Sequence, residues 1–66
     1  MIKLDLEYDD NRGYPIAEIV LSADESHLIP LSGDRAYVNG KGFTVTRRDF
    51  SFEPGNITVS LIGNRD

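Results

Sequence analysis

A short run of basic and aromatic residues, residues 47–52, offers the most suggestive binding chemistry in the chain. Within it, Arg48, Phe50 and Phe52 alternate as a cation and two rings do in proteins that stack single-stranded nucleic-acid bases. This interpretation requires both phenylalanines to be exposed. Because the chain has few large apolar residues to fill a core, we expect Phe50 and Phe52 to be buried, which disfavours nucleic acid as a partner.

The chain carries no recognisable catalytic constellation. It has one histidine, His27, no cysteine, and no Gly-x-Ser-x-Gly nucleophile motif. Catalytic triads are recognised by geometry, and the simpler interpretation of His27 is a loop residue near Pro30. Nothing in the sequence brings Glu18, Asp24 and Glu25 together for acid–base catalysis. We therefore expect no enzymatic activity and no cofactor.

Two glycine-containing stretches match ligand-binding loops only in part. Asp9, Asn11 and Gly13 have the spacing that begins a calcium loop, but the pattern fails at Gly13 and Tyr14, so we expect a turn and no metal. Residues 40–42, Gly-Lys-Gly, lie between predicted strands rather than before a helix, so they do not predict a phosphate site.

Size and charge favour a protein partner. The 66 residues approach the lower limit for a self-sufficient core, and the absence of cysteine excludes disulfides and thiolate metal sites. Self-association or a partner protein is therefore expected. The net charge of −4 is uneven, with two basic and seven acidic residues in positions 1–32 but five basic and four acidic residues in positions 33–66. The acidic half repels phosphate, whereas the polarity could orient a protein partner.

Nothing in the chain predicts a membrane or secretory protein. No stretch approaches the roughly 18 apolar residues of a membrane span, and residues 1–7 alternate charged and apolar types, unlike a signal peptide. We expect a cytoplasmic protein of one small β domain, residues 1–66, from a bacterium or a phage.

The first half of the chain predicts strands separated by turns. Residues 2–8 alternate as in a half-buried strand, and residues 14–21 predict a second strand that is apolar enough to be covered on both faces. Ser22 and Glu25 have capping-box spacing, which predicts one helical turn. Residues 27–31 predict a short extended segment at a sheet edge, because Pro30 cannot donate to a ladder.

The second half is dominated by a hairpin. Asn39-Gly40 between two alternating runs is a strong type I′ turn signal, although periodicity does not distinguish a two-residue from a four-residue loop. Pro54-Gly55 indicates a type II turn before a last strand at residues 57–61. Residues 63–66 are expected to form a loose polar tail.

The hairpin pattern changes phase after its return strand begins. Phe43 and Val45 are odd-numbered, whereas Phe50 and Phe52 are even-numbered, so an unbroken strand would point the two pairs to opposite faces. Either both faces of the strand are covered, or a β-bulge inserts one extra residue and restores a common face. The bulge is favoured, because the first alternative would bury Arg47 and Asp49 on the same side as Val45. We therefore predict a bulge near residues 47–49 that turns the two arginines to the surface.

Together these patterns predict an all-β small barrel or compact sandwich of five or six short antiparallel strands, SH3-like or OB-like, with at most one helical turn. The expected function is a non-enzymatic protein-interaction module, with a homodimer through an edge strand as one form. Two alternatives stay open. One is a single-stranded nucleic-acid binder that uses Arg47, Arg48, Tyr37, Phe50 and Phe52, and the other is an acidic nucleic-acid mimic that uses Asp5, Glu7, Asp9 and Asp10. The expected binding surface comprises Arg47, Arg48, Asp49, Tyr37 and Lys41.

Overall fold

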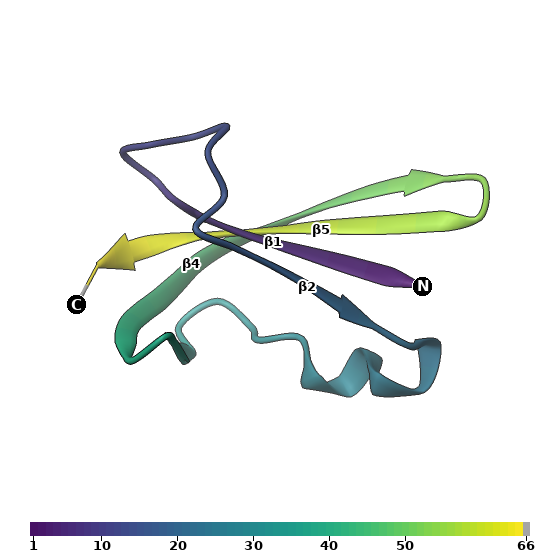
Figure 1. Ribbon diagram of the computed structural model, residues 1–66, viewed down its shortest axis with the longest axis horizontal. Coiled ribbons are helices and arrows are strands. Elements are labelled where there is room, and N and C mark those ends of the chain that lie inside the picture. Colours follow the sequence, from purple (N-terminus) through teal and green to yellow (C-terminus); the bar gives the residue numbers. More distant parts are fainter. Residues whose placement is uncertain (66) are drawn as a thin grey trace.

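One curled sheet contains every strand of residues 1–65, the part of the chain that the computed structural model describes. The sheet forms a half-barrel, which confirms the predicted all-β class (Figure 1). The elements are β1 (Ile2–Tyr8), β2 (Ala17–Leu21), the 3-10 helix η1 (Ala23–Leu28), β3 (Arg35–Val38), β4 (Lys41–Glu53) and β5 (Asn56–Arg65).

The strand order is β2-β1-β5-β4-β3, and one of its pairings is parallel. β1 pairs with β5 in parallel, from Ile2 opposite Ile57 to Tyr8 opposite Gly63, whereas the other three pairings are antiparallel. The prediction of a purely antiparallel set was therefore wrong in this respect. The first and last strands are both apolar on one face, and pairing them at the centre of the sheet buries both.

Three predicted segments differ from the structure. β2 lies at a sheet edge and exposes Ile19 and Val20, so the expected cover on both of its faces is wrong. Residues 27–31 form no strand, because His27 and Leu28 close η1 and the chain then turns, which leaves five strands among the described residues. Residues 63–65 belong to β5 rather than to a tail, and residue 66 lies outside the described part.

Local turn chemistry was predicted correctly. Asn39 and Gly40 both have positive φ, 52° and 79°, and Val38 lies opposite Lys41, so the hairpin has the two-residue loop. Gly55 has φ of 82°, as a type II turn requires, and joins β4 to β5. The capping box of η1 is present, with the Ser22 N–H donating to Glu25 Oε1 at 2.9 Å.

The predicted bulge is present in β4. Val45 lies opposite Gly63 and Arg47 lies opposite Ile62, so Thr46 is the extra residue. The Thr46 hydroxyl donates to the Ile62 carbonyl oxygen at 3.1 Å and ties the bulge to β5. Beyond this point, the even-numbered residues of β4 share a face with Val45.

The inner face of the half-barrel holds the core. Cross-strand rows place Leu4 beside Val59 and Leu6 beside Leu61, and all four side chains are buried. The buried core cluster comprises Ile2, Leu4, Leu6, Leu21, Phe43, Val45, Val59 and Leu61. Ile29, Ala36 and Val38 pack against this cluster, so the segment from η1 to β3 covers one part of the inner face.

Candidate binding surface along strand β4

The second half of β4 has a strand on one side only. β3 pairs with β4 as far as Thr44, and the Ser32 hydroxyl donates to the Thr46 carbonyl oxygen at 2.9 Å. Residues 47–53 pair with β5 along one side, and no other strand of residues 1–65 pairs with them along the opposite side. In Figure 1 this part of β4 runs along the margin of the sheet to its turn with β5. We call residues 47–53 the free edge.

Two phenylalanines stand on the free edge beyond the covered part of the core. Phe50 lies opposite Val59 and Phe52 lies opposite Ile57, which places both rings on the inner face. They are nevertheless 44% and 73% exposed, so the expectation that both are buried is wrong. The bulge places their side chains on the inner face, but Ile29, Ala36 and Val38, which cover part of that face, leave the two rings exposed.

The exposed rings form an ordered group with one arginine. Phe50 and Phe52 stack with centroids 6.0 Å apart and planes 9° apart. The Arg48 guanidinium lies 5.2 Å from the centroid of Phe50, within the range of a cation–π contact. A cation and two parallel rings therefore line the inner side of the free edge.

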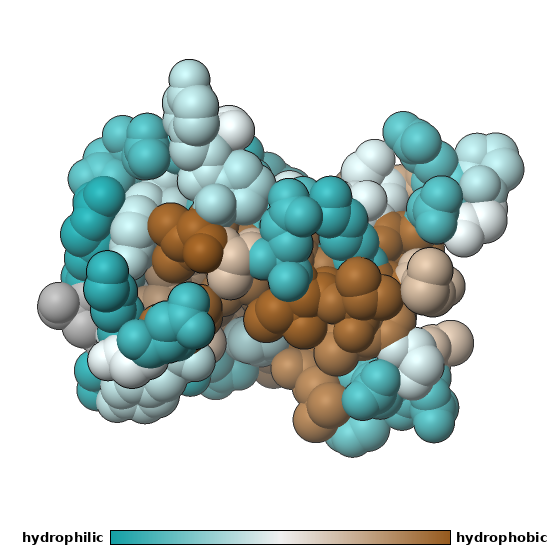
Figure 2. Space-filling model, in the orientation of Figure 1, coloured by the Kyte–Doolittle hydropathy of each residue, from teal (hydrophilic) through white to brown (hydrophobic). Residues whose placement is uncertain are grey.

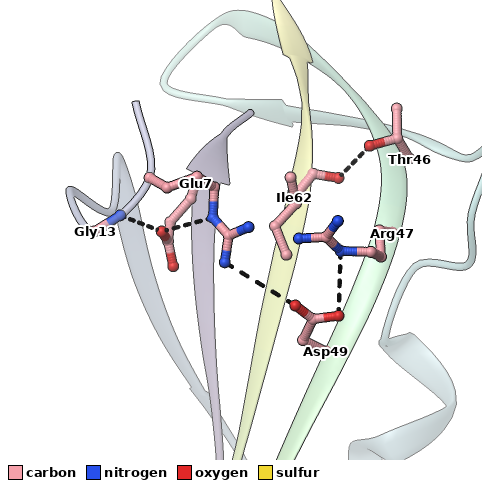
Figure 3. A network of polar contacts seen from close by, with 7 residues as sticks. Glu7, Gly13, Thr46, Arg47, Asp49 and Ile62 are labelled. Atoms are coloured by element: carbon pink, nitrogen blue, oxygen red, sulfur yellow. Dashed lines mark hydrogen bonds and ion pairs between the residues drawn. The ribbon is translucent and has the colours of Figure 1, made fainter. Parts of the chain in front are cut away.

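The outer face of the same strand carries a chain of ion pairs (Figure 3). Arg47 Nε lies 3.2 Å from Asp49, and Asp49 lies 4.0 Å from Arg12. Arg12 Nε in turn lies 3.3 Å from the buried carboxylate of Glu7, which also accepts a 2.6 Å hydrogen bond from the Gly13 N–H. Ile62, opposite Arg47, is buried on this face. The charged network therefore also shields apolar surface, as arginine stems commonly do.

The five residues that the sequence grouped as one surface are distributed over different regions. Arg47 and Asp49 pair on the outer face, whereas Arg48 contacts Phe50 on the inner face, because neighbouring strand residues alternate. Tyr37 is 70% exposed on β3 with the Arg35 guanidinium 5.6 Å from its ring. Lys41 lies across the two-residue turn.

A shallow apolar hollow lies on the inner face next to β2. Its volume is about 170 Å³, and Figure 2 shows hydrophobic side chains gathered along β2 and toward η1. Its lining includes Leu4, Ile19, Leu28, Pro30, Tyr37 and Leu61. The hollow is small and lined by few polar groups, so it has the character of an incompletely covered core rather than a reaction site.

Features of other site classes are weak. Within residues 1–65, no three His, Cys, Asp or Glu side chains gather where they could hold a metal ion, and no helix there has the length and apolar character to cross a membrane. The acidic residues proposed for nucleic-acid mimicry do not form an open row. Glu7 is buried against Arg12, and Asp10 pairs with Arg65 at 2.6 Å.

The sequence contained an unused signal for the free edge. In the register of the Asn39-Gly40 hairpin, residues 47–53 would face residues 26–32. The capping box at Ser22 and the proline at position 30 take most of that segment out of a strand. The return arm of the hairpin is therefore longer than the strand that can pair with it inside the hairpin, and its last residues, including Glu53, which was omitted from the predicted surface, lack that partner. The tertiary structure decided that no other strand pairs there among residues 1–65.

Comparisons with known proteins add no relationship: no family model, no curated protein and no solved structure matches this chain.

Proposed function

We propose that this chain is a non-enzymatic protein-interaction module that binds an extended protein segment along the free edge of β4. The observation that carries the proposal is the edge itself, which offers unpaired backbone groups over residues 47–53 beside exposed aromatic rings. Added strands gain affinity from main-chain hydrogen bonds and specificity from alternate side chains. Natural sheets usually shield such edges, because an open edge recruits other strands.

The free edge is a better candidate than the other sheet edge, β2. β2 has 5 residues, compared with the seven residues of the free edge, and carries no aromatic residue. The rings of Phe50 and Phe52 are large apolar surfaces that a bound strand would remove from water.

A peptide selection would test the proposal. Extended peptides selected from a random library for binding to the isotopically labelled chain should shift the amide resonances of residues 47–53 and leave those of β2 unchanged. Phe52→Pro removes an edge donor, and Phe52→Ser removes the ring but retains the N–H. Both variants should weaken binding, the proline variant more strongly. Peptides that shift β2 instead, or that bind Phe52→Pro as well as the natural chain, would contradict the proposal.

Single-stranded nucleic-acid binding is a second candidate, and the exposure of the Phe50–Phe52 stack favours it. Bases stack on exposed rings beside arginine, which is the arrangement that Arg48 and Phe50 provide. Fluorescence anisotropy with short RNA and DNA oligomers at low salt would test it. Phe52→Ser should abolish binding, whereas Tyr14→Ser, which removes an exposed ring elsewhere, should not. An absence of binding under these conditions would exclude this function.

A further inference from the structure

The free edge has sharp limits. At one end, Ser32 contacts the Thr46 carbonyl oxygen, and at the other end, the chain turns at Pro54-Gly55. Between these limits lies a run of seven residues whose midpoint is Phe50. A strand that pairs with the whole free edge must therefore pair with residues 47–53 and cannot extend the pairing beyond them.

The direction of the backbone groups on this edge follows from Val45. The Val45 N–H donates to the Asp34 carbonyl oxygen at 2.9 Å, and its carbonyl accepts from the Gly33 N–H at 2.7 Å, so both groups point away from β5. In a strand of L-residues, the face of the side chain fixes the side to which N–H and C=O point. Arg48, Phe50 and Phe52 share the inner face with Val45. Their backbone N–H and C=O groups therefore point in the plane of the sheet away from β5, toward the unpaired side of β4.

The sequence of the edge is complementary to itself in the antiparallel direction. With a twofold axis at Phe50, Arg47 lies opposite Glu53, Arg48 opposite Phe52, and Asp49 opposite Ser51. The register therefore gives an ion pair at each end, cation–π pairs inside them and an aromatic pair at the centre. Such directly opposed pairs stabilise antiparallel sheets.

Neighbouring registers lack this complementarity. A shift that places the axis at Asp49 opposes that residue to its own copy, and a shift that places it at Ser51 opposes Asp49 to Glu53. Both bring like charges together, which destabilises a cross-strand pair. An axis between two residues would pair inner-facing with outer-facing side chains, which the pleat does not permit.

We infer that the occupant of the free edge is a second copy of this chain, paired antiparallel through residues 47–53 about a twofold axis at Phe50. This inference rests on the proposed function and names its partner. Arg48, Phe50 and Phe52 form the hydrogen-bonded pairs across the axis. Arg47 and the partner's Glu53 form a non-hydrogen-bonded pair, in which side chains approach more closely. The two sheets join into one continuous sheet, and the Phe50 and Phe52 rings of both copies cover one another.

Charge reversal at the ends of the edge tests this dimer. The natural chain should show twice the 7.4 kDa chain mass in light scattering as its concentration rises. Glu53→Arg and Arg47→Glu each place like charges at both ends and should weaken dimerisation about tenfold or more. Mixing the two variants should restore a heterodimer, visible by native mass spectrometry, and the doubly swapped chain should restore a homodimer. Glu18→Arg, an equal change of an exposed charge on β2, should leave dimerisation unchanged.

A cysteine trap tests the register. The natural chain has no cysteine, so Phe50→Cys introduces a single thiol at the axis. Hydrogen-bonded antiparallel partners have Cα atoms about 5.5 Å apart, within the range of a disulfide, so a mild oxidant should link the two copies. Phe52→Cys is the control, because its two copies lie four residues apart along the strands, about 13 Å, and should not be linked.

The outcomes separate this inference from the proposed function. A chain that stays at the monomer mass up to millimolar concentration overturns the dimer, and selected peptides that still bind residues 47–53 would leave the proposed function standing. If the chain forms no dimer and the selected peptides do not bind residues 47–53, both the dimer and the proposed function are overturned. If Glu18→Arg disrupts the dimer and Glu53→Arg leaves it intact, the assignment of the dimer to the free edge is wrong. If Phe52→Cys is linked efficiently, the assigned register is wrong.

Discussion

Phe50 and Phe52 stack ring on ring at 6.0 Å on the inner face of the sheet, yet both remain exposed. Neighbours two apart on one strand share a face, so their contact follows from strand geometry. Their exposure has a different cause, because the segment from η1 to β3 covers only part of the inner face and leaves both rings exposed. The ring pair is therefore positioned by the core but does not belong to it.

This position predicts a separation between stability and association. Phe52→Ser should change the free energy of unfolding by no more than about 0.5 kcal/mol at concentrations where the chain is monomeric, because its ring is 73% exposed. Phe43→Ala, which empties a fully buried site, should cost about 3–5 kcal/mol. Urea unfolding checks both values, and equal costs would show that Phe52 is part of the core.

The orientation of the strands can be checked by truncation of aliphatic residues. Leu4→Ala should cost about 2–5 kcal/mol and Val45→Ala about 2 kcal/mol, because both side chains are buried on the inner face. Val20→Ala is the matched control, since that valine is 60% exposed, and should cost about 0.5 kcal/mol or less. A negligible cost at Val45 would mean that the hairpin faces the other way.

Gly63 is predicted to tolerate no side chain. A Cβ atom at this position would lie 2.1 Å from the Thr44 carbonyl oxygen and 2.8 Å from the Phe43 ring. Gly63→Ala must therefore shift the backbone of β4 or β5, and we expect a loss of about 3 kcal/mol or more. Asn64→Ala, at the exposed neighbouring position, should cost about 0.5 kcal/mol or less. Thermal unfolding monitored by circular dichroism would show the difference.

The two arginines of the outer-face network should differ in importance. Arg12→Ala leaves the buried Glu7 carboxylate with the Gly13 N–H, and we expect a cost of about 1–3 kcal/mol. Arg47→Ala removes a pair with the exposed Asp49, which is screened by solvent and should cost about 1 kcal/mol or less. Chemical denaturation in low and moderate salt would rank them. An equal or larger cost for Arg47→Ala would contradict the assigned role of Glu7.

Ser22 controls two acid groups at the start of η1. Its hydroxyl donates to Asp24 and is the main cause of the lowered pKa of Asp24, whereas its backbone N–H is the main cause of the lowered pKa of Glu25. Ser22→Ala should therefore raise the pKa of Asp24 toward its ordinary value and raise that of Glu25 only in part. Carboxyl chemical shifts followed through a pH titration would measure both.

The sign of the accompanying stability change follows from these lowered pKa values. A carboxylate whose pKa is lower in the folded than in the unfolded chain stabilises the fold above its unfolded pKa, and this contribution is lost as the pH falls through the folded pKa. Acidification should thus loosen η1 in the natural chain, and this pH dependence should weaken in Ser22→Ala. An identical acid response in both chains would argue against the capping role.

Features that depend on neighbouring residues were readable from the sequence. Asn39-Gly40 located the turn because both residues tolerate positive φ, and Ser22 with Glu25 located the start of η1. The length of the hairpin loop was left open by the pattern and is two residues in the structure. The change of parity between Val45 and Phe50 favoured a bulge near residues 47–49, and the structure has it one residue earlier, at Thr46. The alternating pattern therefore assigned a common face correctly to the apolar residues of β1, β3, β4 and β5, but not to those of β2.

What covers each face was decided only by the tertiary structure. The change of phase placed Phe50 and Phe52 on the same face as Val45, but whether anything lies over them depends on the path of residues 22–38 across the half-barrel. The parallel pairing of β1 with β5 joins segments from the two ends of the chain, and no local signal specifies it. The positions of the turns, the presence of the bulge and the face of most strand side chains could thus be predicted from neighbouring residues in the sequence. Long-range packing decided which strands became edges, and it left residues 47–53 with a paired strand on one side only.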